Sequence, residues 1–283
     1  MNGTALALVL VAAVVHAMWN LVAKDAPGGA RFVFLYYTVS AVALLPLVLW
    51  QLIAGPYHPQ WTWLGAAAVT AVLHVAYGVV LQRGYAVGDL SVVYPLARGS
   101  GPLLSVLAAV LLLAERPGPL GLLGAFAVVA GVLVISGGGA GSLASRAGVG
   151  YGLLTGTAIA GYTLWDAFAV TTLAVPPLIY FGLGALLQSA LLAPFAMRGS
   201  ATRALWREHR GKVVLVGALS PVAYVCVLYA MRLAPVSLVA PARELSIVLG
   251  SFAAWRLLGE PHPVRRIVGA TVVLAGVTAI ALA

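Results

Sequence analysis

The sequence predicts an all-α integral membrane protein, with ten transmembrane helices arranged as two inverted five-helix repeats. The first observation is composition: of 283 residues, 62% are hydrophobic and only 8% are charged, whereas about a quarter of the residues in soluble domains are charged. The second is that apolar runs recur along the whole chain at about the 20 residues that span a bilayer. The third is that polar residues of the first half recur, at the same spacing, in the second.

Ten windows have the length and apolar character of a membrane span. They cover approximately residues 4–23, 32–54, 62–82, 91–113, 119–137, 149–172, 176–197, 212–232, 236–258 and 264–282. A transmembrane barrel would instead show segments of about ten residues with alternating polarity, which this sequence lacks. No positive charge precedes the first window and it is long enough to span, so we expect a helix rather than a cleavable signal peptide.

The net charge of +9 comes largely from Lys and Arg at the predicted helix ends, a pattern typical of membrane orientation rather than of nucleic-acid binding. Most of these residues fall in the loops that follow odd-numbered helices: Lys24, Arg31, Arg83, Arg146, Arg198, Arg203, Arg207, Arg210, Lys212, Arg256, Arg265 and Arg266. The other side has only Arg116 and Arg232. The bias predicts a multi-pass protein of the cell (plasma or inner) membrane, with loops 1–2, 3–4, 5–6, 7–8 and 9–10 cytoplasmic and both termini outside.

The internal repeat is clearest near the end of each half. Residues 91–112 align without a gap on residues 237–258, which pairs Ser91 with Ser237, Pro95 with Pro241, Ser100 with Ser246 and Ser105 with Ser251. After one residue is dropped, Glu115 falls on Glu260, and Gly124 and Gly131 fall on Gly269 and Gly276. These glycines recur every seven residues and predict faces where helices approach closely. The repeats cover residues 1–140 and 147–283, and together form one membrane domain.

An odd number of spans in each repeat makes the second repeat enter the membrane from the opposite side, and transporters use this symmetry to build a midplane site. The segments "AERPGPLGLLGAFAVVAGVLVI" and "GEPHPVRRIVGATVVLAGVTAI", each after a Pro-containing helix, make the chain resemble the EamA-type proteins of the drug/metabolite transporter superfamily over essentially its whole length. The resemblance implies a secondary transporter with a central cavity lined mainly by helices 1, 3, 4, 6, 8 and 9. Such proteins usually have both termini inside and a basic loop 2–3, whereas "GPYHPQ" here has no Lys or Arg.

Four charged residues fall in the predicted spans away from the loops, nearer the bilayer centre: Arg98, Asp166, Arg243 and Glu244. A charge at the bilayer centre costs about 2.5 to 3.5 kcal/mol on insertion scales, so we expect all four to be paired or to face a wet cavity. The repeat alignment places Arg98 and Glu244 at equivalent positions, which predicts an ion pair across the pseudo-two-fold axis. That pair could hold the two halves together permanently, or Arg98 could release Glu244 to bind a substrate carboxylate.

Polar and aromatic side chains in the same spans complete the expected cavity. They are His16, Trp19 and Asn20 in the first span, His74 and Tyr77 in the third, Tyr94 in the fourth, Tyr162 and Trp165 in the sixth, and Tyr224 in the eighth. Trp19 is equally compatible with a place at the membrane interface, and His74 with hydrogen-bonded packing. Pro95 and Pro241 each remove a backbone donor, which predicts kinks that either serve as hinges or have no function.

These observations predict a secondary transporter, and specifically an exporter, of small metabolites such as amino acids or drugs, working by alternating access. The sequence has no Gly-rich phosphate loop with a lysine, so ATP is not the expected direct energy source. Either a proton, bound by Glu244, Asp166 or a histidine, or an exchanged solute would drive transport. The expected partners are a small-molecule substrate and the lipid bilayer, without nucleic acid. No cofactor or metal is expected, since the one cysteine, Cys226, allows no disulfide or thiolate metal site.

Two alternatives to a transporter remain open at this stage. The segment "RGSG" at residues 98–101 is similar to the GxSG of membrane serine proteases, with His16 or His74 as a possible base for Ser100. However, Arg98 replaces the first glycine of that motif, so an enzyme is not the expected function. A membrane receptor or scaffold is the other alternative, against which only the inverted repeat argues.

Overall fold

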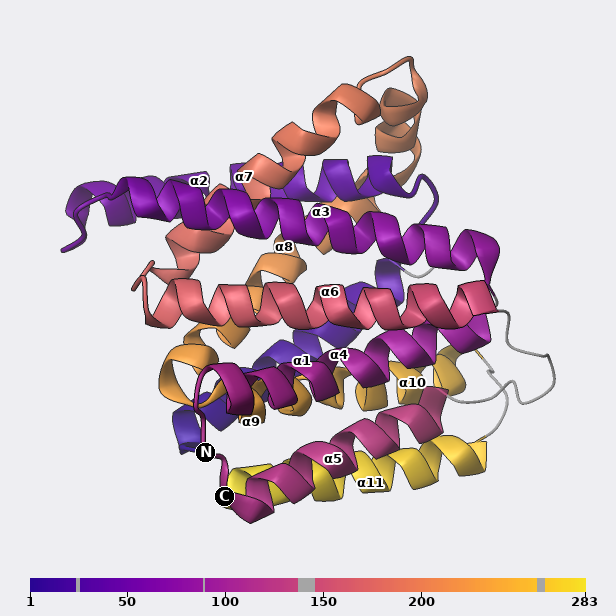
Figure 1. The fold of residues 1–283 in the computed structure, drawn as a ribbon. Helices are drawn as coiled ribbons and strands as arrows, with labels where there is room; N and C mark the ends of the chain where they lie inside the picture. The colour runs from indigo at the N-terminus through magenta and orange to yellow at the C-terminus, as the bar shows by residue number, and fades with distance from the viewer. Residues whose placement is uncertain (24–25, 89, 137–145, 259–262) are drawn as a thin grey trace.

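The computed structural model of the chain describes residues 1–23, 26–88, 90–136, 146–258 and 263–283. The described residues form eleven α-helices (Figure 1). They are α1 (Gly3–Ala23), α2 (Ala30–Ala54), α3 (Trp61–Val87), α4 (Leu90–Leu112), α5 (Gly118–Ser136), α6 (Arg146–Thr171), α7 (Pro177–Ala196), α8 (Ala201–Leu233), α9 (Val236–Ala242), α10 (Leu245–Leu258) and α11 (Pro263–Leu282). Because α9 and α10 are two parts of one predicted span, these helices make ten spans and confirm the all-α fold.

Length and composition alone qualify nine stretches of the described residues as membrane spans, with α9 and the start of α10 counted together. The remaining helix is α6, in which glycines, threonines and Asp166 interrupt the apolar residues. A helix of this composition needs other helices around it, because lipid does not satisfy its polar groups. Consistent with that requirement, α6 packs against α3, α4 and α8, and many of its residues are buried.

Helix α8 corrects the expectation of a long loop between the seventh and eighth spans. It begins at Ala201 rather than near residue 212, and its backbone breaks at His209, where φ is −122° and ψ is 20°. Leu205, from the segment before this break, is buried in a small core with Phe32, Val213 and Val216. Burial of this apolar residue explains why the basic segment folds as helix instead of remaining a solvated loop.

The ninth span is interrupted at its centre, between α9 and α10. Pro241 lies in the last turn of α9 and provides no backbone N–H, so the helical hydrogen bond to the Ser237 carbonyl is missing. The chain then turns tightly, with the Glu244 N–H donating to the Pro241 carbonyl at 2.9 Å. The break predicted at Pro241 is therefore present. In contrast, the backbone of α4 continues through residue 95 without interruption, and the side chain of Pro95 lies outside the described residues.

Helices α5 and α11, which are equivalent in the two repeats, pack side by side (Figure 1). A Cβ atom added to Gly131 would lie 2.7 Å from the Gly269 carbonyl oxygen, and one added to Gly124 would lie 2.7 Å from the Gly276 carbonyl oxygen. The two backbones therefore touch at both glycine pairs. This confirms the close approach predicted from the seven-residue spacing, and it joins the first repeat to the second.

A second connection between the repeats involves Glu115, which follows α4. Its carboxylate accepts hydrogen bonds from the backbone N–H groups of Val236, at 2.9 Å, and Ser237, at 2.8 Å. These N–H groups start α9 and have no partner within the helix, so an anion there satisfies them and interacts favourably with the helix dipole. The equivalent residue in the second repeat, Glu260, lies outside the described residues.

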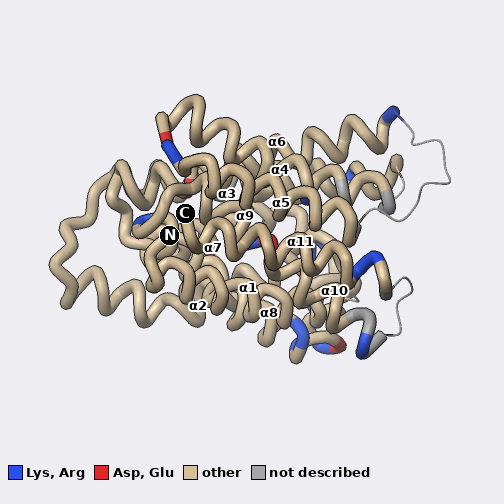
Figure 2. The backbone as a smooth tube through the Cα atoms, turned by 90° about the horizontal axis from the view of Figure 1, so that it is seen from below, with Lys and Arg blue, Asp and Glu red and all other residues tan. Residues whose placement is uncertain are grey.

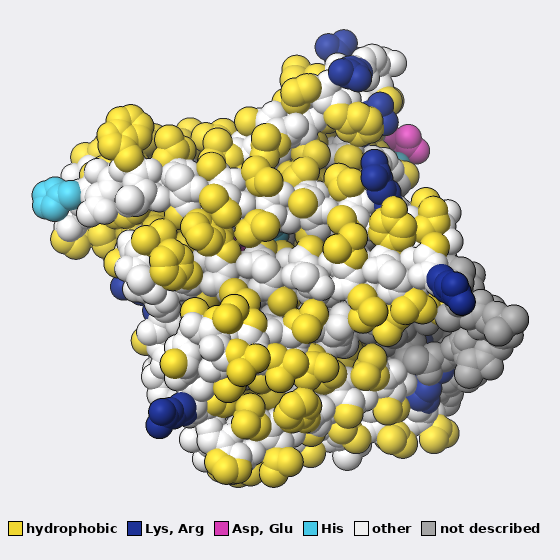
Figure 3. All heavy atoms as spheres, in the orientation of Figure 1, with side chains coloured by type: hydrophobic (Ala, Val, Ile, Leu, Met, Phe, Trp, Pro, Cys, Tyr) yellow, Lys and Arg dark blue, Asp and Glu magenta, His cyan; other side chains and the backbone are white. Residues whose placement is uncertain are grey.

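The surface of the molecule matches a protein surrounded by lipid. Hydrophobic side chains spread over the face shown in Figure 3, while charged side chains lie toward its edges. Most of the Lys and Arg positions in Figure 2 gather at the end opposite the two termini. The termini themselves lie at one end of the molecule (Figure 1), where the Met1 amino group is 3.5 Å from the Ala281 carbonyl oxygen. An even number of spans accounts for this common end.

Candidate functional site

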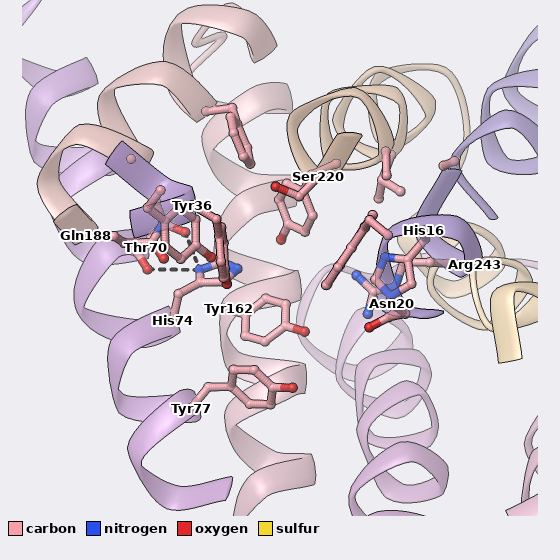
Figure 4. A pocket seen from close by; sticks show the side chains of 18 of the residues that line it. His16, Asn20, Tyr36, Thr70, His74, Tyr77, Tyr162, Gln188, Ser220 and Arg243 are labelled. Carbon is pink, nitrogen blue, oxygen red and sulfur yellow. Dashed lines mark hydrogen bonds between the residues drawn. The ribbon is translucent and has the colours of Figure 1, made fainter. Parts of the chain in front are cut away.

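A central cavity of about 330 Å³ lies between the two repeats. Helices α1, α2, α3 and α4 of the first repeat line it, together with α6, α7, α8 and the α9–α10 break of the second. The resemblance implied helices 1, 3, 4, 6, 8 and 9, so α2 and α7 are additions. Figure 4 shows His16, Asn20 and Arg243 on one side of the cavity, facing Thr70 and His74 across it.

The structure brings most of the predicted site residues to this cavity. Those that line it are His16, Trp19, Asn20, His74, Tyr77, Tyr94, Arg98, Tyr162, Tyr224 and Arg243. Three others, Trp165, Asp166 and Glu244, were expected in the lining but lie behind it. The indole N–H of Trp165 donates to the backbone carbonyl of Ala66 at 3.0 Å, which ties α6 to α3. Asp166 and Glu244 are 0% and 1% exposed, and act on the cavity through the lining residues that they hold.

The ion pair predicted from the repeat alignment is present. Arg98 Nη2 lies 3.0 Å from Glu244 Oε2, and Arg243 Nε lies 3.7 Å from Glu244 Oε1. One buried carboxylate thus faces two guanidinium groups, which leaves one formal positive charge in excess. The Arg98 contact lacks the angle of a hydrogen bond, since Glu244 Oε2 has no hydrogen-bond partner among the described residues. The Glu244 carboxylate therefore compensates the charge of Arg98 without accepting a hydrogen bond from each of the Arg98 N–H groups.

Three lining residues carry buried polar atoms for which the described residues offer no hydrogen-bond partner. These atoms are Trp19 Nε1, Arg98 Nε and Ser220 Oγ. Each comes from a different helix, α1, α4 or α8. A buried donor left without an acceptor costs about 1 to 3 kcal/mol, so such atoms are uncommon in a wall that only packs. Further atoms of this kind lie outside the lining among the described residues, so these three do not by themselves identify a ligand site.

Asp166 is a hub of hydroxyl groups from three other helices. Its Oδ1 accepts hydrogen bonds from Thr70 Oγ1 of α3, at 2.6 Å, and from the Tyr180 hydroxyl of α7, also at 2.6 Å. Its Oδ2 accepts a hydrogen bond from the Tyr224 hydroxyl of α8. Thr70, Tyr180 and Tyr224 all line the cavity. Asp166 thus fixes one part of the cavity wall from behind.

His74 connects the cavity to this hub. Its Nδ1 lies 3.0 Å from Thr70 Oγ1 and 3.0 Å from the Thr70 carbonyl oxygen, the contacts drawn as dashed lines in Figure 4. The ring stacks on Tyr162, with ring centroids 4.2 Å apart, and meets the Tyr224 ring edge-on at 5.6 Å. His74 is therefore held in one orientation by a hydrogen bond and two aromatic rings.

Sequence reasoning missed seven polar residues of the lining. They are Tyr36 and Tyr37 of α2, Thr70 and Tyr85 of α3, Tyr180 and Gln188 of α7, and Ser220 of α8. One signal could have found part of this set: an adjacent aromatic pair occurs in the second helix of each repeat, Tyr36–Tyr37 and Tyr180–Phe181. Isolated hydroxyl and amide groups such as Ser220 and Gln188 carry no such signal, because they are common in membrane helices in general.

The geometry does not support the proposed catalytic serine. Ser100 Oγ donates to the Leu96 carbonyl of its own helix at 2.5 Å, and the Ser100 side chain packs on Gly156 of α6. Ser100 is absent from the lining of the described cavity, whereas His16 and His74 are both part of it. The hydroxyl therefore serves the contact between α4 and α6, where Gly156 leaves room for it.

Comparison with known proteins agrees with this architecture. The EamA-like transporter family model matches residues 3–137 and residues 146–282, one match in each half of the chain. A crystal structure of another protein aligns with 100% of this chain and 98% of that protein's chain, with a TM-score of 0.77 and 18% sequence identity. Identity this low supports the fold alone, and no curated protein matches the chain. Because the family model covers both repeats, the chain belongs to the EamA-like transporter family and is a membrane transporter.

Proposed function

We propose that the protein is a secondary transporter that exports small metabolites bearing a carboxylate, amino acids above all, through the central cavity by alternating access. The observation that carries the proposal is the cavity between the repeats, in which two arginines share one buried carboxylate. The family relationship supports transport, and the cavity supports the kind of solute.

The size of the cavity supports a small solute. A volume of about 330 Å³ lies at the lower end of the range of about 300 to 1,000 Å³ that is usual for ligand sites. Tyrosines and Trp19 make much of the wall, and such side chains combine an apolar face with a polar edge. The wall therefore accommodates a solute that has both an apolar part and a polar group.

The charges of the cavity support a carboxylate on that solute. Arg98 and Arg243 share Glu244, so a second carboxylate would restore neutrality at this group of three. The planar guanidinium of Arg98 matches a carboxylate in geometry, and the Arg98 side chain is 17% exposed in the wall of the cavity. When the solute carboxylate binds Arg98, Glu244 would either move away from Arg98 or stay paired with Arg243. Drugs with an acidic group meet the same description.

The position of the cavity supports alternating access. It lies between inverted repeats, and such repeats form sites that can open to either face by rocking against each other. The break between α9 and α10 places Arg243 and Glu244 at the site, in backbone that is irregular only where it is buried in protein. The charge bias of the loops further supports an orientation with both termini outside the cell.

Flux through the purified protein in liposomes tests the proposal. A panel of labelled amino acids is measured with and without a pH gradient, and protein-free liposomes are the control. We expect at least one amino acid to move faster in proteoliposomes, and to be competed out by its unlabelled form. Absence of protein-dependent flux for the entire panel would contradict the proposed substrate class. Hydrolytic activity lost in Ser100→Ala would instead revive the enzyme alternative.

A further inference from the structure

Asp166 is a buried carboxyl group that has no basic partner among the described residues. It is fully buried, and its three contacts are all hydroxyl groups. Hydroxyl groups can both donate and accept hydrogen bonds, so these partners can serve the carboxyl group in either protonation state. Ionisable residues inside membrane segments commonly form proton relays.

A short path joins this carboxyl group to the cavity. His74 lines the cavity, its Nδ1 is 3.0 Å from Thr70 Oγ1, and Thr70 Oγ1 is 2.6 Å from Asp166 Oδ1. Thr70 donates its hydroxyl proton to Asp166, and the Thr70 carbonyl oxygen can only accept, so His74 Nδ1 must be the donor in both contacts. We therefore assign the proton of the neutral imidazole to Nδ1. His74 Nε2 is then the acceptor that remains for a proton from the cavity.

We propose that Asp166 is the proton-binding site that couples this transporter to a proton gradient, and that His74 and Thr70 carry the proton to it from the cavity. The proposal rests on the proposed transport function. It gives roles to a buried group and to two cavity residues that carboxylate recognition by Arg98 does not use.

The transfer is a balanced shift of protons along three side chains. A proton binds to the lone pair of His74 Nε2, and the ring releases its Nδ1 proton to Thr70 Oγ1. At the same time the hydroxyl proton of Thr70 passes to Asp166 Oδ1. His74 ends neutral with its proton on Nε2, Thr70 ends unchanged, and Asp166 ends as a neutral carboxylic acid. Proton exchange with water in the cavity then returns His74 to its first tautomer.

Protonation at this position acts on the walls of the cavity. A carboxylate accepts stronger hydrogen bonds than a neutral carboxyl group does, so protonation weakens the contacts that Tyr180 and Tyr224 make with Asp166. Those contacts tie α6 to α7 and α8. Weakening them favours a rearrangement of α6 relative to α7 and α8, which is the kind of change that alternating access requires.

The other charged and titratable groups near Asp166 contact residues other than Asp166. From α4 and the α9–α10 break, Arg98 and Arg243 both face Glu244. From α6 itself, Tyr162 stacks on His74 and lies edge-on to Tyr77 of α3. With Asp166 ionised, the two arginines and two carboxylates sum to zero charge. Protonation leaves one positive charge in excess, which also favours a carboxylate-bearing substrate in the cavity.

Infrared difference spectroscopy of the purified protein tests the proton site without any substrate. The probe is the proton itself, and the signal is the carbonyl stretch of a protonated carboxyl group as the pH is lowered from about 9 to about 5. We expect such a band in the wild-type protein, its loss in Asp166→Asn, and its retention in the control Glu115→Gln. In Tyr224→Phe the band should move to higher frequency, because Tyr224 donates to Oδ2, which becomes the carbonyl oxygen once Oδ1 carries the proton.

Three outcomes of this titration would overturn the proposal: no pH-dependent carboxyl band, a band that persists in Asp166→Asn, or an Asp166 band of constant intensity at every pH. If Asp166→Asn fails to fold, a shift of the band in Tyr224→Phe or in Asp166→Glu still assigns it to residue 166. The route is tested by a pH jump: Thr70→Val should slow the appearance of the band at least tenfold, and Thr70→Ser should restore the wild-type rate. Equal rates in all three proteins would exclude the route through Thr70.

Coupling is tested by flux of whichever labelled amino acid the wild-type protein exchanges. The measured quantity is the ratio of flux with a pH gradient to flux without one. We expect a ratio well away from unity for the wild type and a ratio of unity for Asp166→Asn. A wild-type ratio of unity would overturn coupling at Asp166 while leaving transport intact. If no amino acid is exchanged at all, the proposed function fails, and the infrared titration still decides the proton site.

Discussion

Arg98 of α4 and Glu244 at the break between α9 and α10 form an ion pair across the two repeats, with Nη2 and Oε2 3.0 Å apart. The side chain of Arg98 is 17% exposed, whereas that of Glu244 is 1% exposed. The arginine is therefore the partner that the cavity can reach, and the glutamate is the partner that it cannot. This asymmetry assigns substrate recognition to Arg98 and charge compensation to Glu244.

Exchanging the two charges separates these roles. Either single variant, Arg98→Glu or Glu244→Arg, brings like charges together and should lower the free energy of unfolding by about 3 to 5 kcal/mol, the cost of breaking a buried pair. The double variant should recover most of that loss in thermal unfolding, but not the flux, because the carboxylate would then stand where the cavity is open. Full recovery of flux in the double variant would mean that the pair is structural only.

Replacing Gly131 by leucine should destabilise the contact between α5 and α11. A Cβ atom there would lie 2.7 Å from the Gly269 carbonyl oxygen, so the two helices must separate, at a cost of about 1 to 3 kcal/mol. Gly65→Leu in α3 is the matched control, because nothing lies within 4 Å of the added Cβ. Thermal unfolding in detergent should show a lower Tm for Gly131→Leu alone, and similar Tm values for both variants would rule out the glycine contact as a source of stability.

Replacing Glu115 by glutamine should weaken the start of α9. The carboxylate accepts one backbone N–H on each oxygen, whereas the amide keeps one acceptor and loses the negative charge. The expected loss is about 0.5 to 2 kcal/mol, as for other helix caps, measured by chemical unfolding. Glu208→Gln is the control, since the side chain of Glu208 is 75% exposed. A loss of the same size in both variants would count against the cap.

A reporter fused after Ala283 tests the orientation proposed from the loop charges. With both termini outside, the reporter should show activity only in its extracytoplasmic form. A second reporter inserted at Ser200, in the turn between α7 and α8, should give the opposite result. The spans α8, α9–α10 and α11 lie between Ser200 and Ala283, and an odd number of spans places the two positions on opposite sides of the membrane. A cytoplasmic signal from Ala283 together with an external one from Ser200 would reverse the orientation.

The fold was largely predictable because its determinants are periodic. Windows of span length located all ten spans, including α6, which is less apolar than the others. The alignment of the repeats identified the Arg98–Glu244 pair, and the glycine spacing predicted faces of close approach without naming α5 and α11 as partners. The break of the ninth span was only partly predictable, since Pro95 removes a donor in the same way as Pro241 and yet α4 continues through residue 95. These features depend on local chemistry or on symmetry, and the sequence displays both.

The cavity wall was less predictable because it depends on how the helices rotate about their axes. Asp166 was identified as a charge in a span, but its place behind the wall follows from Thr70, Tyr180 and Tyr224, which come from three other helices. Nothing in the local sequence of Gln188 or Ser220 indicates the direction of the side chain. The helical start of α8 was missed because its basic residues suggested a loop, whereas the burial of Leu205 decides its structure.

The central claim, that Arg98 binds the carboxylate of a transported solute, is tested most directly by amino-acid flux in liposomes that contain Arg98→Gln. Arg232→Gln, which removes a basic residue near the end of α8, is the matched control. The account predicts that Arg98→Gln lowers flux at least tenfold, which corresponds to about 1.4 kcal/mol of lost binding, while Arg232→Gln keeps the wild-type flux. Wild-type flux in a correctly folded Arg98→Gln protein would contradict it.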